Sequence, residues 1–223
     1  MSMFFKKPIS VDYSLYLIAD AEFASGRDLV PLIEAAVRGG VTVVQLRAKG
    51  YPYGDFLELG RRTAAALKKR HIPLIINDQV DIALACRAAG VHLGQDDMPP
   101  AIVRKMLSKG TVIGVSVNTL EEALEAERQG ADYVGAGPVF RTATKATDLP
   151  VLGPEGIRRI KDGLHIPVIA VGGITEENAR AVKEAGADGI AVVSAILGGP
   201  DPQKAARELK RVIGDSSPSW REI

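Results

Sequence analysis

The sequence predicts an α/β protein built as a single (β/α)8 TIM barrel. Short apolar runs alternate along the chain with amphipathic helical patterns, eight of each, and this alternation is typical of parallel strands covered by helices. The 223 residues suit one barrel of normal size, and no linker-like shift in composition divides them. A glycine-containing turn also recurs between helix and strand, for example at Gly39-Gly40 and Gly186. These three observations favour one closed barrel.

The expected strands are short and rich in Val, Ile and Leu. They cover residues 15–19, 41–46, 73–76, 91–93, 111–115, 132–134, 167–171 and 189–193. The expected helices follow the period of about 3.6 residues of an amphipathic helix. They cover residues 27–39, 53–70, 80–89, 100–108, 120–129, 154–162, 176–185 and 202–213. The barrel domain would span residues 15–213, after an N-terminal extension (1–14) and before a polar C-terminal tail (214–223).

A doubly wound open sheet is the main alternative architecture. Such a sheet is expected to carry a glycine-rich phosphate-binding turn after its first strand. The residues in that place, Asp20-Ala21-Glu22-Phe23, contain no glycine. The closed barrel is therefore preferred.

Composition excludes several classes of function. Lys and Arg number 28 against 27 Asp and Glu, which leaves a net charge of +1, so bulk charge indicates neither a nucleic-acid nor a membrane partner. The single cysteine, Cys86, excludes an intramolecular disulfide and is expected to be a small buried hydrophobe. The chain has no apolar run of transmembrane length, and its first ten residues lack the apolar core of a secretory signal. We therefore expect a soluble, cytoplasmic protein.

A long polar loop, residues 135–153, separates the sixth expected strand from the next helix. It contains Arg141, Thr142, Thr144 and Lys145. Hydroxyls, cations and backbone amides made accessible by glycine are the groups that bind a phosphorylated ligand. Loops of this length are usually functional or disordered, so a plain surface loop is the alternative. We interpret the segment as a substrate-gripping loop.

The end of the second expected strand carries a polar cluster. In TIM barrels the active site lies at the carboxyl ends of the strands. Gln45, Arg47 and Lys49 alternate along the chain and therefore face the same way. One amide and two cations suit an anionic group, and arginine can bind phosphate oxygens in a fork. The alternative is a solvated set of side chains at a strand end.

Acidic residues follow the third and fourth expected strands, in Asn77-Asp78 and Asp96-Asp97. Carboxylates from neighbouring strands repel one another unless a cation lies between them. Magnesium suits such a site because it accepts a few carboxylates together with waters and phosphate oxygens. Asp96 and Asp97 cannot both point inward easily, and Asp97 could instead cap the next helix.

The histidines do not indicate a transition-metal site. His92 lies in the middle of an expected strand with an inward or core role, and His71 and His165 lie in turns at the opposite end of the barrel. Ser116, after the fifth strand, has no accompanying histidine base in this interpretation. We therefore expect Ser116 to hydrogen-bond a ligand and not to act as a hydrolase nucleophile.

Glycines mark the end of the seventh expected strand at Gly172-Gly173, and the eighth ends near Val193-Ser194. These two strand ends form the recurrent phosphate site of TIM barrels, through backbone amides and helix N-termini. The mouth would thus combine a site for a metal-bound pyrophosphate with a separate site for a monophosphate. This combination predicts a transferase that acts on two phosphorylated substrates.

Motifs along the chain resemble those of thiamine-phosphate synthases. They are QLRAK at 45–49, IIND at 75–78, VHLGQDDMP at 91–99, GVS at 114–116, ADYVGAGPVFRTATK at 131–145, GGI at 172–174 and ADGIAVVSAI at 187–196. They occur in that family's order and cover nearly the whole chain from Leu15 to Ile213. The resemblance implies a (β/α)8 transferase that joins the diphosphate of 4-amino-5-hydroxymethyl-2-methylpyrimidine to a thiazole phosphate. The products would be thiamine phosphate and pyrophosphate.

The resemblance also implies roles for individual residues. Those implied to bind the pyrimidine diphosphate are Gln45, Arg47, Lys49, Asn77, Ser116 and Lys145. Leu46 and Ala48 complete the expected substrate-binding set, although alternation turns the Ala48 side chain away from Gln45 and Arg47. Those implied to bind the thiazole phosphate are Thr142, Ala143, Thr144, Gly173, Val193 and Ser194. The implied magnesium ligands are Asp78 and Asp97, which makes Asp96 the neighbouring acidic residue that is not a ligand.

By resemblance the mechanism is dissociative. Pyrophosphate leaves first, and the thiazole nitrogen attacks the cation that remains on the pyrimidine. Magnesium, Arg47, Lys49 and Lys145 would stabilise the charge of the leaving group, and Ser116 completes the expected catalytic set. The thiazole nitrogen is already a free nucleophile, so no general base is needed.

The chain departs from the family pattern at three positions. Ala48 stands where Glu is frequent, Asn118 where His is frequent, and Arg141 where Pro is frequent. A related thiazole tautomerase uses a histidine at the position of Asn118 and typically lacks the acidic pair, so the synthase is favoured here. The alternatives are a tautomerase-like paralogue and a non-catalytic sensor of phosphorylated ligands.

The expected partners are the two small-molecule substrates and Mg²⁺, with neither nucleic acid nor membrane. The sequence leaves the oligomeric state open, and a homo-oligomer is one of the options. The tail at 215–223 has no evident role, although Trp220 could dock on the barrel or on another subunit.

Overall fold

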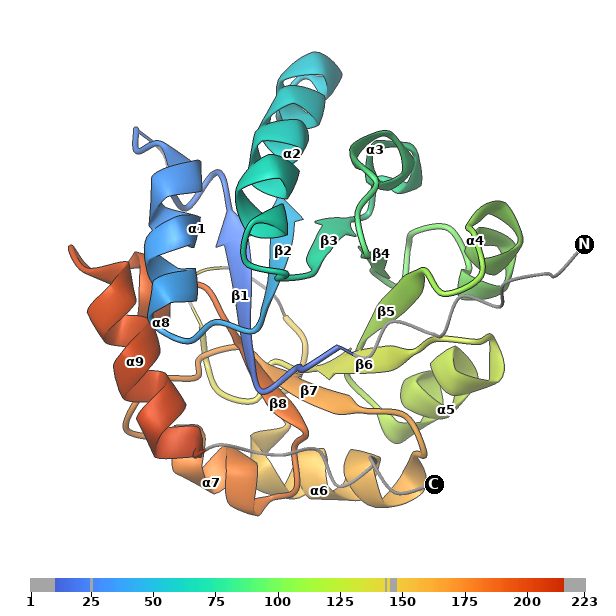
Figure 1. Ribbon diagram of the computed structural model, residues 1–223. Helices are drawn as coiled ribbons and strands as arrows, with labels where there is room; N and C mark the ends of the chain where they lie inside the picture. The colour runs from blue at the N-terminus through green and yellow to red at the C-terminus, as the bar shows by residue number, and fades with distance from the viewer. Residues whose placement is uncertain (1–10, 25, 143, 145–147, 215–223) are drawn as a thin grey trace, which may run out of the picture.

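Eight parallel strands form a closed barrel at the centre of the molecule (Figure 1). The computed structural model describes residues 11–24, 26–142, 144 and 148–214. The strands are β1 (Leu15–Asp20), β2 (Val43–Arg47), β3 (Leu74–Asn77), β4 (Gly90–Leu93), β5 (Val112–Val117), β6 (Tyr133–Ala136), β7 (Val168–Val171) and β8 (Gly189–Val192). They pair in sequence order, and β8 pairs with β1 to close the barrel. The predicted (β/α)8 barrel is confirmed, and the open sheet is excluded because each strand has two paired neighbours.

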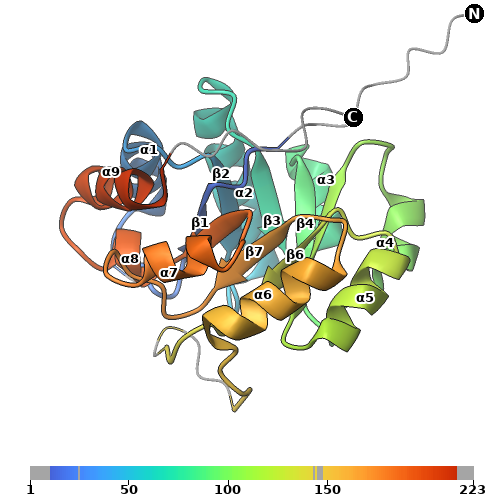
Figure 2. The same ribbon diagram turned by 90° about the horizontal axis from the view of Figure 1, so that it is seen from below.

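Helices surround the barrel and cover its outer face (Figures 1 and 2). Those that correspond to predicted helices are α1 (Leu29–Arg38), α2 (Tyr53–Lys68), α3 (Val80–Cys86), α4 (Pro100–Met106), α5 (Leu120–Arg128), α6 (Gly153–Gly163), α7 (Ala179–Glu184) and α9 (Pro202–Ile213). A further helix, α8 (Ser194–Leu197), follows β8. The sequence does not predict α8, because four residues are too few for a periodic apolar pattern to be recognised.

Two helices are shorter than their apolar patterns suggest. Helix α3 ends at Cys86 because Arg87 adopts the left-handed conformation, with a φ of 51°. Helix α7 begins only at Ala179, because the side chain of Asn178 holds the preceding residues in a turn. The amide of Asn178 accepts from the Thr175 N–H at 2.8 Å and donates to the Gly173 carbonyl at 2.9 Å.

Side chains fill the interior of the barrel. Three tyrosines, Tyr13, Tyr16 and Tyr133, belong to the buried cluster inside it. The rings of Tyr13 and Tyr133 lie 4.8 Å apart between centroids. Gly114 on β5 makes room for this arrangement, since a Cβ at Gly114 would lie 2.1 Å from the Tyr133 ring. The interior is therefore a packed aromatic layer, and its hydroxyl groups lie below the mouth of the barrel.

A larger apolar core lies between the strands and the helices. Cys86 belongs to it, and Gly60 of α2 allows the close approach, because a Cβ at Gly60 would lie 2.7 Å from the Cys86 sulfur. Burial raises the pKa of the Cys86 thiol. The prediction that Cys86 is a small buried hydrophobe is confirmed. Within the described ranges, no helix has both the length and the apolar character that a membrane crossing requires.

Some predicted features lie outside the described residues. The N-terminal extension is described only from Val11 onward, and the C-terminal tail only at Gly214. The division of the chain into extension (1–14), barrel (15–213) and tail (214–223) therefore stays a prediction. Ala143 and Lys145, two expected ligand-binding residues, also lie outside the described part.

Candidate active site

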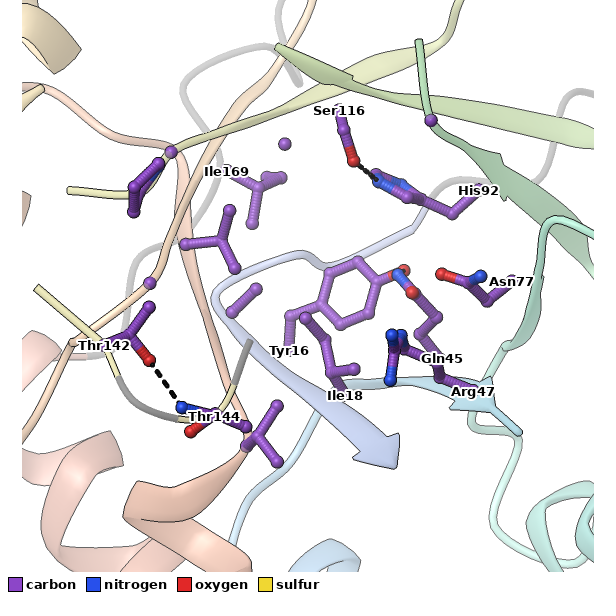
Figure 3. Close-up of a pocket in the computed structure, with 18 of the residues that line it drawn as sticks. Tyr16, Ile18, Gln45, Arg47, Asn77, His92, Ser116, Thr142, Thr144 and Ile169 are labelled. Carbon is purple, nitrogen blue, oxygen red and sulfur yellow. Dashed lines mark hydrogen bonds between the residues drawn. The ribbon is translucent and has the colours of Figure 1, made fainter. Parts of the chain in front are cut away.

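A cavity of about 590 Å³ opens at the carboxyl ends of the strands. Its walls include side chains from all eight strands, and its volume is typical of small-molecule sites. The predicted site residues that line it are Gln45, Arg47, Lys49, Asn77, Asp97, Ser116, Thr142, Thr144, Gly173, Val193 and Ser194. Figure 3 shows Gln45, Arg47 and Asn77 on one side of the cavity, with Thr142 and Thr144 across from them. The part of the β6–α6 loop that the structure describes extends from this end of the barrel (Figure 2).

Alternation along β2 separates its residues into two sets. Gln45 and Arg47 line the cavity, as does Lys49 just after the strand. Leu46 and Ala48 point the other way into the core between strands and helices, where they are 0% and 5% exposed. The structure thus brings Gln45, Arg47 and Lys49 to the cavity and not Leu46 or Ala48.

Arg47 is held in place by an acidic partner at the end of β1. Its guanidinium forms an ion pair with Asp20 and lies 3.7 Å from the Glu22 carboxylate. Asp20 is 4% exposed and also accepts hydrogen bonds from the backbone N–H groups of Glu22 and Phe23. With its carboxylate fixed by three donors, Asp20 orients the guanidinium toward the cavity mouth. Asp20 is absent from the predicted site, although its place at a strand end was a usable signal.

Lys49 and two carboxylates form a charged group beside β3 and β4. The Lys49 ammonium lies 3.1 Å from an Asp78 carboxylate oxygen. Asp97 accepts a hydrogen bond from the Gly94 N–H at 2.6 Å. Asp97 does not cap α4, whose N-cap is Pro99 without a side-chain hydrogen bond. The helix-capping alternative for Asp97 is therefore wrong, and Asp97 instead faces the cavity.

Burial, followed by the neighbouring Asp97 carboxyl, raises the pKa of Asp78, while Lys49 acts in the opposite direction. Asp78 and Asp97 therefore lie close enough to interact, although the former is outside the lining of the cavity. Two carboxylates that share a partly buried site are stabilised by a cation.

The donor set of this carboxylate pair fits magnesium. Both side chains offer only oxygen ligands, which Mg²⁺ prefers. No cluster of three or more His, Cys, Asp and Glu side chains suited to a metal occurs in the described residues. Water and phosphate oxygens of a ligand would have to complete the coordination, as is usual for magnesium sites that bind phosphorylated substrates.

Ser116 has a histidine neighbour, contrary to the sequence interpretation. His92 Nε2 lies 2.9 Å from Ser116 Oγ (Figure 3). Strand register explains the contact: His92 on β4 pairs with Gly114 on β5, so that Ser116 lies two residues further toward the mouth on the same face. His92 is 8% exposed, which confirms its expected inward role. The prediction that Ser116 lacks a histidine is wrong.

The contact between Ser116 and His92 belongs to a longer chain of hydrogen bonds. His92 Nδ1 lies 2.9 Å from the Tyr133 hydroxyl, which lies 2.8 Å from the Tyr16 hydroxyl. The Gln45 Nε2 group donates to Tyr16 at 3.0 Å. Burial raises the pKa of Tyr16 and of Tyr133, so both stay protonated. Five strands thus contribute to one polar network beneath the cavity.

Asn118 anchors both ends of the loop between β6 and α6. Its Nδ2 group donates to the Gly137 carbonyl and to the Pro150 carbonyl, each at 3.0 Å. Thr142 and Thr144 lie between these points, and the Thr144 N–H donates to Thr142 Oγ1 at 3.2 Å. The Asn118 side chain is therefore engaged in holding the loop over the cavity.

Glycines and backbone shape the opposite wall. Gly172 and Gly173 have positive φ values of 97° and 66°. A Cβ at Gly173 would lie 2.5 Å from the Arg141 carbonyl oxygen, so only glycine fits this close approach. Ser194 is exposed and begins α8 directly after Val193. This wall offers backbone groups and hydroxyls where the β2–β4 wall offers charged side chains.

A family model described as thiamine monophosphate synthase matches residues 15–196 of the chain. The chain belongs to this family. It is 46% identical to the thiamine-phosphate synthase of Syntrophomonas wolfei, over 92% of this chain and 98% of that protein. It is also 46% identical to the thiamine-phosphate synthase of Clostridium tetani, over 90% of this chain and 95% of that protein.

A solved structure, thiamine phosphate pyrophosphorylase from Pyrococcus furiosus, has a TM-score of 0.83 with this chain. The two are 40% identical, and the alignment covers 91% of this chain and 96% of that one. A 3-hexulose-6-phosphate synthase, with a TM-score of 0.65 and 22% identity, shows only that the barrel is shared. As a member of the thiamine monophosphate synthase family, the chain is an enzyme of the transferase class.

Several residues that line the cavity are not predicted from the sequence. Asp20, Tyr16, His92 and Tyr133 line the cavity but are absent from the predicted set. Gln95, whose side chain donates to the Ser116 carbonyl at 2.6 Å, is also absent. The inward-facing positions of the strands were the signal for Tyr16 and Tyr133, since alternation places them on the face that Gln45 occupies.

Proposed function

We propose that this chain is a thiamine-phosphate synthase. It joins the diphosphate of 4-amino-5-hydroxymethyl-2-methylpyrimidine to a thiazole phosphate and releases pyrophosphate with thiamine phosphate. The observation that carries the proposal is one cavity with two chemically different walls. Cations and carboxylates lie at β2–β4, and glycines with hydroxyls lie at β6–β8. Such a cavity suits two phosphorylated substrates of unequal charge.

The β2–β4 wall is suited to a pyrophosphate leaving group. Arg47, oriented by Asp20, can bind phosphate oxygens in a fork, and Lys49 adds a second positive charge nearby. Negative charge grows on the leaving group as its bond to carbon breaks, and fixed cations stabilise that state more than the bound substrate. Lys145, outside the described residues, remains the predicted third cation.

Asp78 and Asp97 are the residues that would hold Mg²⁺ in this enzyme. When bound, the ion would neutralise part of the pyrophosphate charge. The raised pKa of Asp78 fits this role, because its causes are burial and the neighbouring Asp97 carboxyl, and a nearby cation favours the charged form of both groups. Lys49 pairs with Asp78 in the described structure and thereby balances part of the same negative charge.

The heterocycles would be held by uncharged groups. Gln45, Asn77 and Ser116 line the cavity and would bind the pyrimidine. Thr142, Thr144, Gly173, Val193 and Ser194, with Ala143 outside the described part, would bind the thiazole phosphate.

The reaction is proposed to be dissociative. The bond between the pyrimidine methylene and the pyrophosphate oxygen breaks with its electron pair moving to oxygen. The thiazole nitrogen then donates its lone pair to the methylene cation. Because this nitrogen loses no proton, no side chain has to act as a general base, and His92 is not required to deprotonate Ser116. An electron-withdrawing substituent on the pyrimidine should therefore slow the reaction strongly, and equal rates would argue against a dissociative step.

Formation of thiamine phosphate from the two purified substrates, with and without magnesium, tests the proposal. We expect product only when the metal is present. Absence of product under all conditions, with retained binding of the thiazole phosphate, would instead favour the tautomerase-like or the sensor alternative. The hydrogen bonds of Asn118 argue against a tautomerase, because its amide is engaged by the Gly137 and Pro150 carbonyls.

A further inference from the structure

The hydrogen-bond network beneath the cavity joins two groups that face the ligand. Gln45 on β2 and Ser116 on β5 both line the cavity, and hydrogen bonds through three further side chains connect them. We call these three residues, Tyr16, Tyr133 and His92, the relay. Tyr16 and Tyr133 are 1% and 0% exposed, so water does not compete for their hydroxyl groups.

Burial constrains the direction of the hydrogen bonds in the relay. The Gln45 amide donates to Tyr16, whose oxygen therefore already accepts one hydrogen. If Tyr133 also donated to Tyr16, the Tyr16 hydrogen would need a third partner in a fully buried position, which is costly. If Tyr16 instead donates to Tyr133, each hydroxyl accepts once and donates once. The order in which Tyr16 donates to Tyr133 is therefore favoured.

This order determines the tautomer of His92. A Tyr133 hydroxyl that accepts from Tyr16 donates its own hydrogen to His92 Nδ1. In the neutral imidazole the proton then lies on Nε2, which donates to Ser116 Oγ. The Ser116 hydroxyl hydrogen is left to donate into the cavity. At the other end, Tyr16 holds one hydrogen of the Gln45 Nε2 group and so fixes the orientation of this amide. Its Oε1 acceptor and its second Nε2 hydrogen stay available.

We propose that the relay of Tyr16, Tyr133 and His92 fixes the Gln45 amide and makes Ser116 a donor toward the substrate ring, and thereby selects an amino-substituted pyrimidine over its oxo analogue. The proposal rests on the proposed function and deepens it. Relay residues are positioning residues, because they act through Gln45 and Ser116.

The aminopyrimidine and its oxo analogue differ in their pattern of hydrogen-bond donors and acceptors. An aminopyrimidine has an amine that donates and unprotonated ring nitrogens that accept. In the oxo analogue a carbonyl acceptor replaces the amine, and a neighbouring ring nitrogen carries a hydrogen. The hydrogen on that ring nitrogen therefore meets the hydrogen that Ser116 donates, which sets donor against donor. Buried polar groups left without partners are the strongest basis for rejecting a close analogue.

The first test compares two variants that each lose one tyrosine hydroxyl. Tyr133→Phe keeps the ring but interrupts the relay, whereas Tyr13→Phe removes a hydroxyl from the neighbouring ring, which packs against Tyr133 outside the relay. For each protein, kcat/KM is measured with the aminopyrimidine diphosphate and with its 4-oxo analogue. We expect the wild type and Tyr13→Phe to prefer the amino substrate at least about 100-fold. We expect Tyr133→Phe to reduce that preference about ten-fold or more.

The second test observes the His92 tautomer directly. The chain has three histidines, so a two-bond nitrogen–proton spectrum of ¹⁵N-histidine protein contains few signals, and His92→Gln identifies the relevant one. We expect the Nε2–H tautomer in the wild type and in Tyr13→Phe. In Tyr133→Phe we expect a mixture of tautomers, because Nδ1 has lost its hydroxyl donor. A wild-type His92 protonated on Nδ1, or on both nitrogens, would overturn the proposal.

The outcomes separate this proposal from the proposed function. If the wild type makes no thiamine phosphate, the proposed function fails, and selectivity is then measured as binding of the free aminopyrimidine against its oxo analogue. If the wild type is active but Tyr133→Phe keeps the full preference and the same tautomer, the relay has only a packing role and the proposal fails. The spectrum needs no activity, so it decides the hydrogen-bond order in either case.

Discussion

Charged side chains form the β2–β4 wall of the cavity, whereas glycines, loop hydroxyls and backbone form the β6–β8 wall. On the first wall each cation is matched by a carboxylate, Arg47 by Asp20 and Lys49 by Asp78. On the second wall the chain adopts positive φ values at Gly172 and Gly173, and the β7 end lies against the β6–α6 loop.

The two walls therefore depend on different properties of their residues. Partly buried charges keep their positions only while their partners remain, because an isolated buried charge is costly. A wall of backbone carries no net charge but depends on shape, since a single added Cβ would collide with the loop. We therefore expect the first wall to be sensitive to charge and geometry of side chains, and the second to be sensitive to volume.

The largest effect is expected from removing one carboxylate charge on the first wall. Asp78→Asn keeps the shape but loses the negative charge proposed to hold Mg²⁺, and kcat/KM should fall at least about 100-fold. Steady-state assays over a range of magnesium concentrations measure this loss. As control, Glu125→Gln removes a surface carboxylate paired with Arg128 and should leave activity unchanged. Normal activity of Asp78→Asn at low magnesium would refute the metal role of this wall.

A smaller loss is expected when the charge is kept and the geometry is changed. Arg47→Lys retains a cation beside Asp20 but cannot bind two phosphate oxygens in a fork. We expect kcat/KM to fall about 10- to 100-fold, with most of the loss in kcat if the fork acts on the leaving group. Arg62→Lys, at the exposed ion pair with Asp28, is the matched control. Full activity of Arg47→Lys would mean that only charge matters at this position.

On the second wall a methyl group should be enough to disturb binding. Gly173→Ala places a Cβ 2.5 Å from the Arg141 carbonyl at a φ of 66°. We expect KM for the thiazole phosphate to rise about ten-fold and stability to fall by about 1–3 kcal/mol. Gly110→Ala has a similar positive φ of 90° but nothing within 4 Å of the added atom, so it isolates backbone strain. If both variants raise KM equally, backbone strain explains the rise, and a collision of the added Cβ with the loop does not.

The smallest effect is expected in the pH dependence of stability, and it should come from the first wall. Because the pKa of Asp78 is raised in the folded protein, its contribution is favourable below its unfolded pKa and is lost as the pH rises through the folded pKa. Melting temperatures without metal should therefore decline by a few degrees over that range. Asp78→Asn should weaken the decline, and added Mg²⁺ should reverse it in the wild type. A decline that is identical in the variant would assign it to other groups.

Sequence patterns were sufficient for the fold because the information they use is local. Apolar periodicity distinguishes strands from helices, and the alternation of the two classes requires parallel strands. The positions of Arg47 and Ser116 at the cavity follow from the same reasoning, since alternation states which face of a strand a residue occupies. Helix α8 is not predicted in this way, because its four residues are too few to show the periodicity of an amphipathic helix.

Only the tertiary structure decided which side chains meet across the barrel. His92 and Ser116 are 24 residues apart, and Tyr16 and Tyr133 are 117 residues apart, yet each pair is joined by one hydrogen bond. Alternation places a residue on the inner face, but the register between strands and the closure of the sheet determine its height and its neighbours. Local sequence patterns are thus enough for the barrel and for the faces of Gln45 and Arg47, whereas the orientation of Asp97 follows only from the structure. The partners of Asp20, His92 and Ser116 were decided by the packing of distant strands.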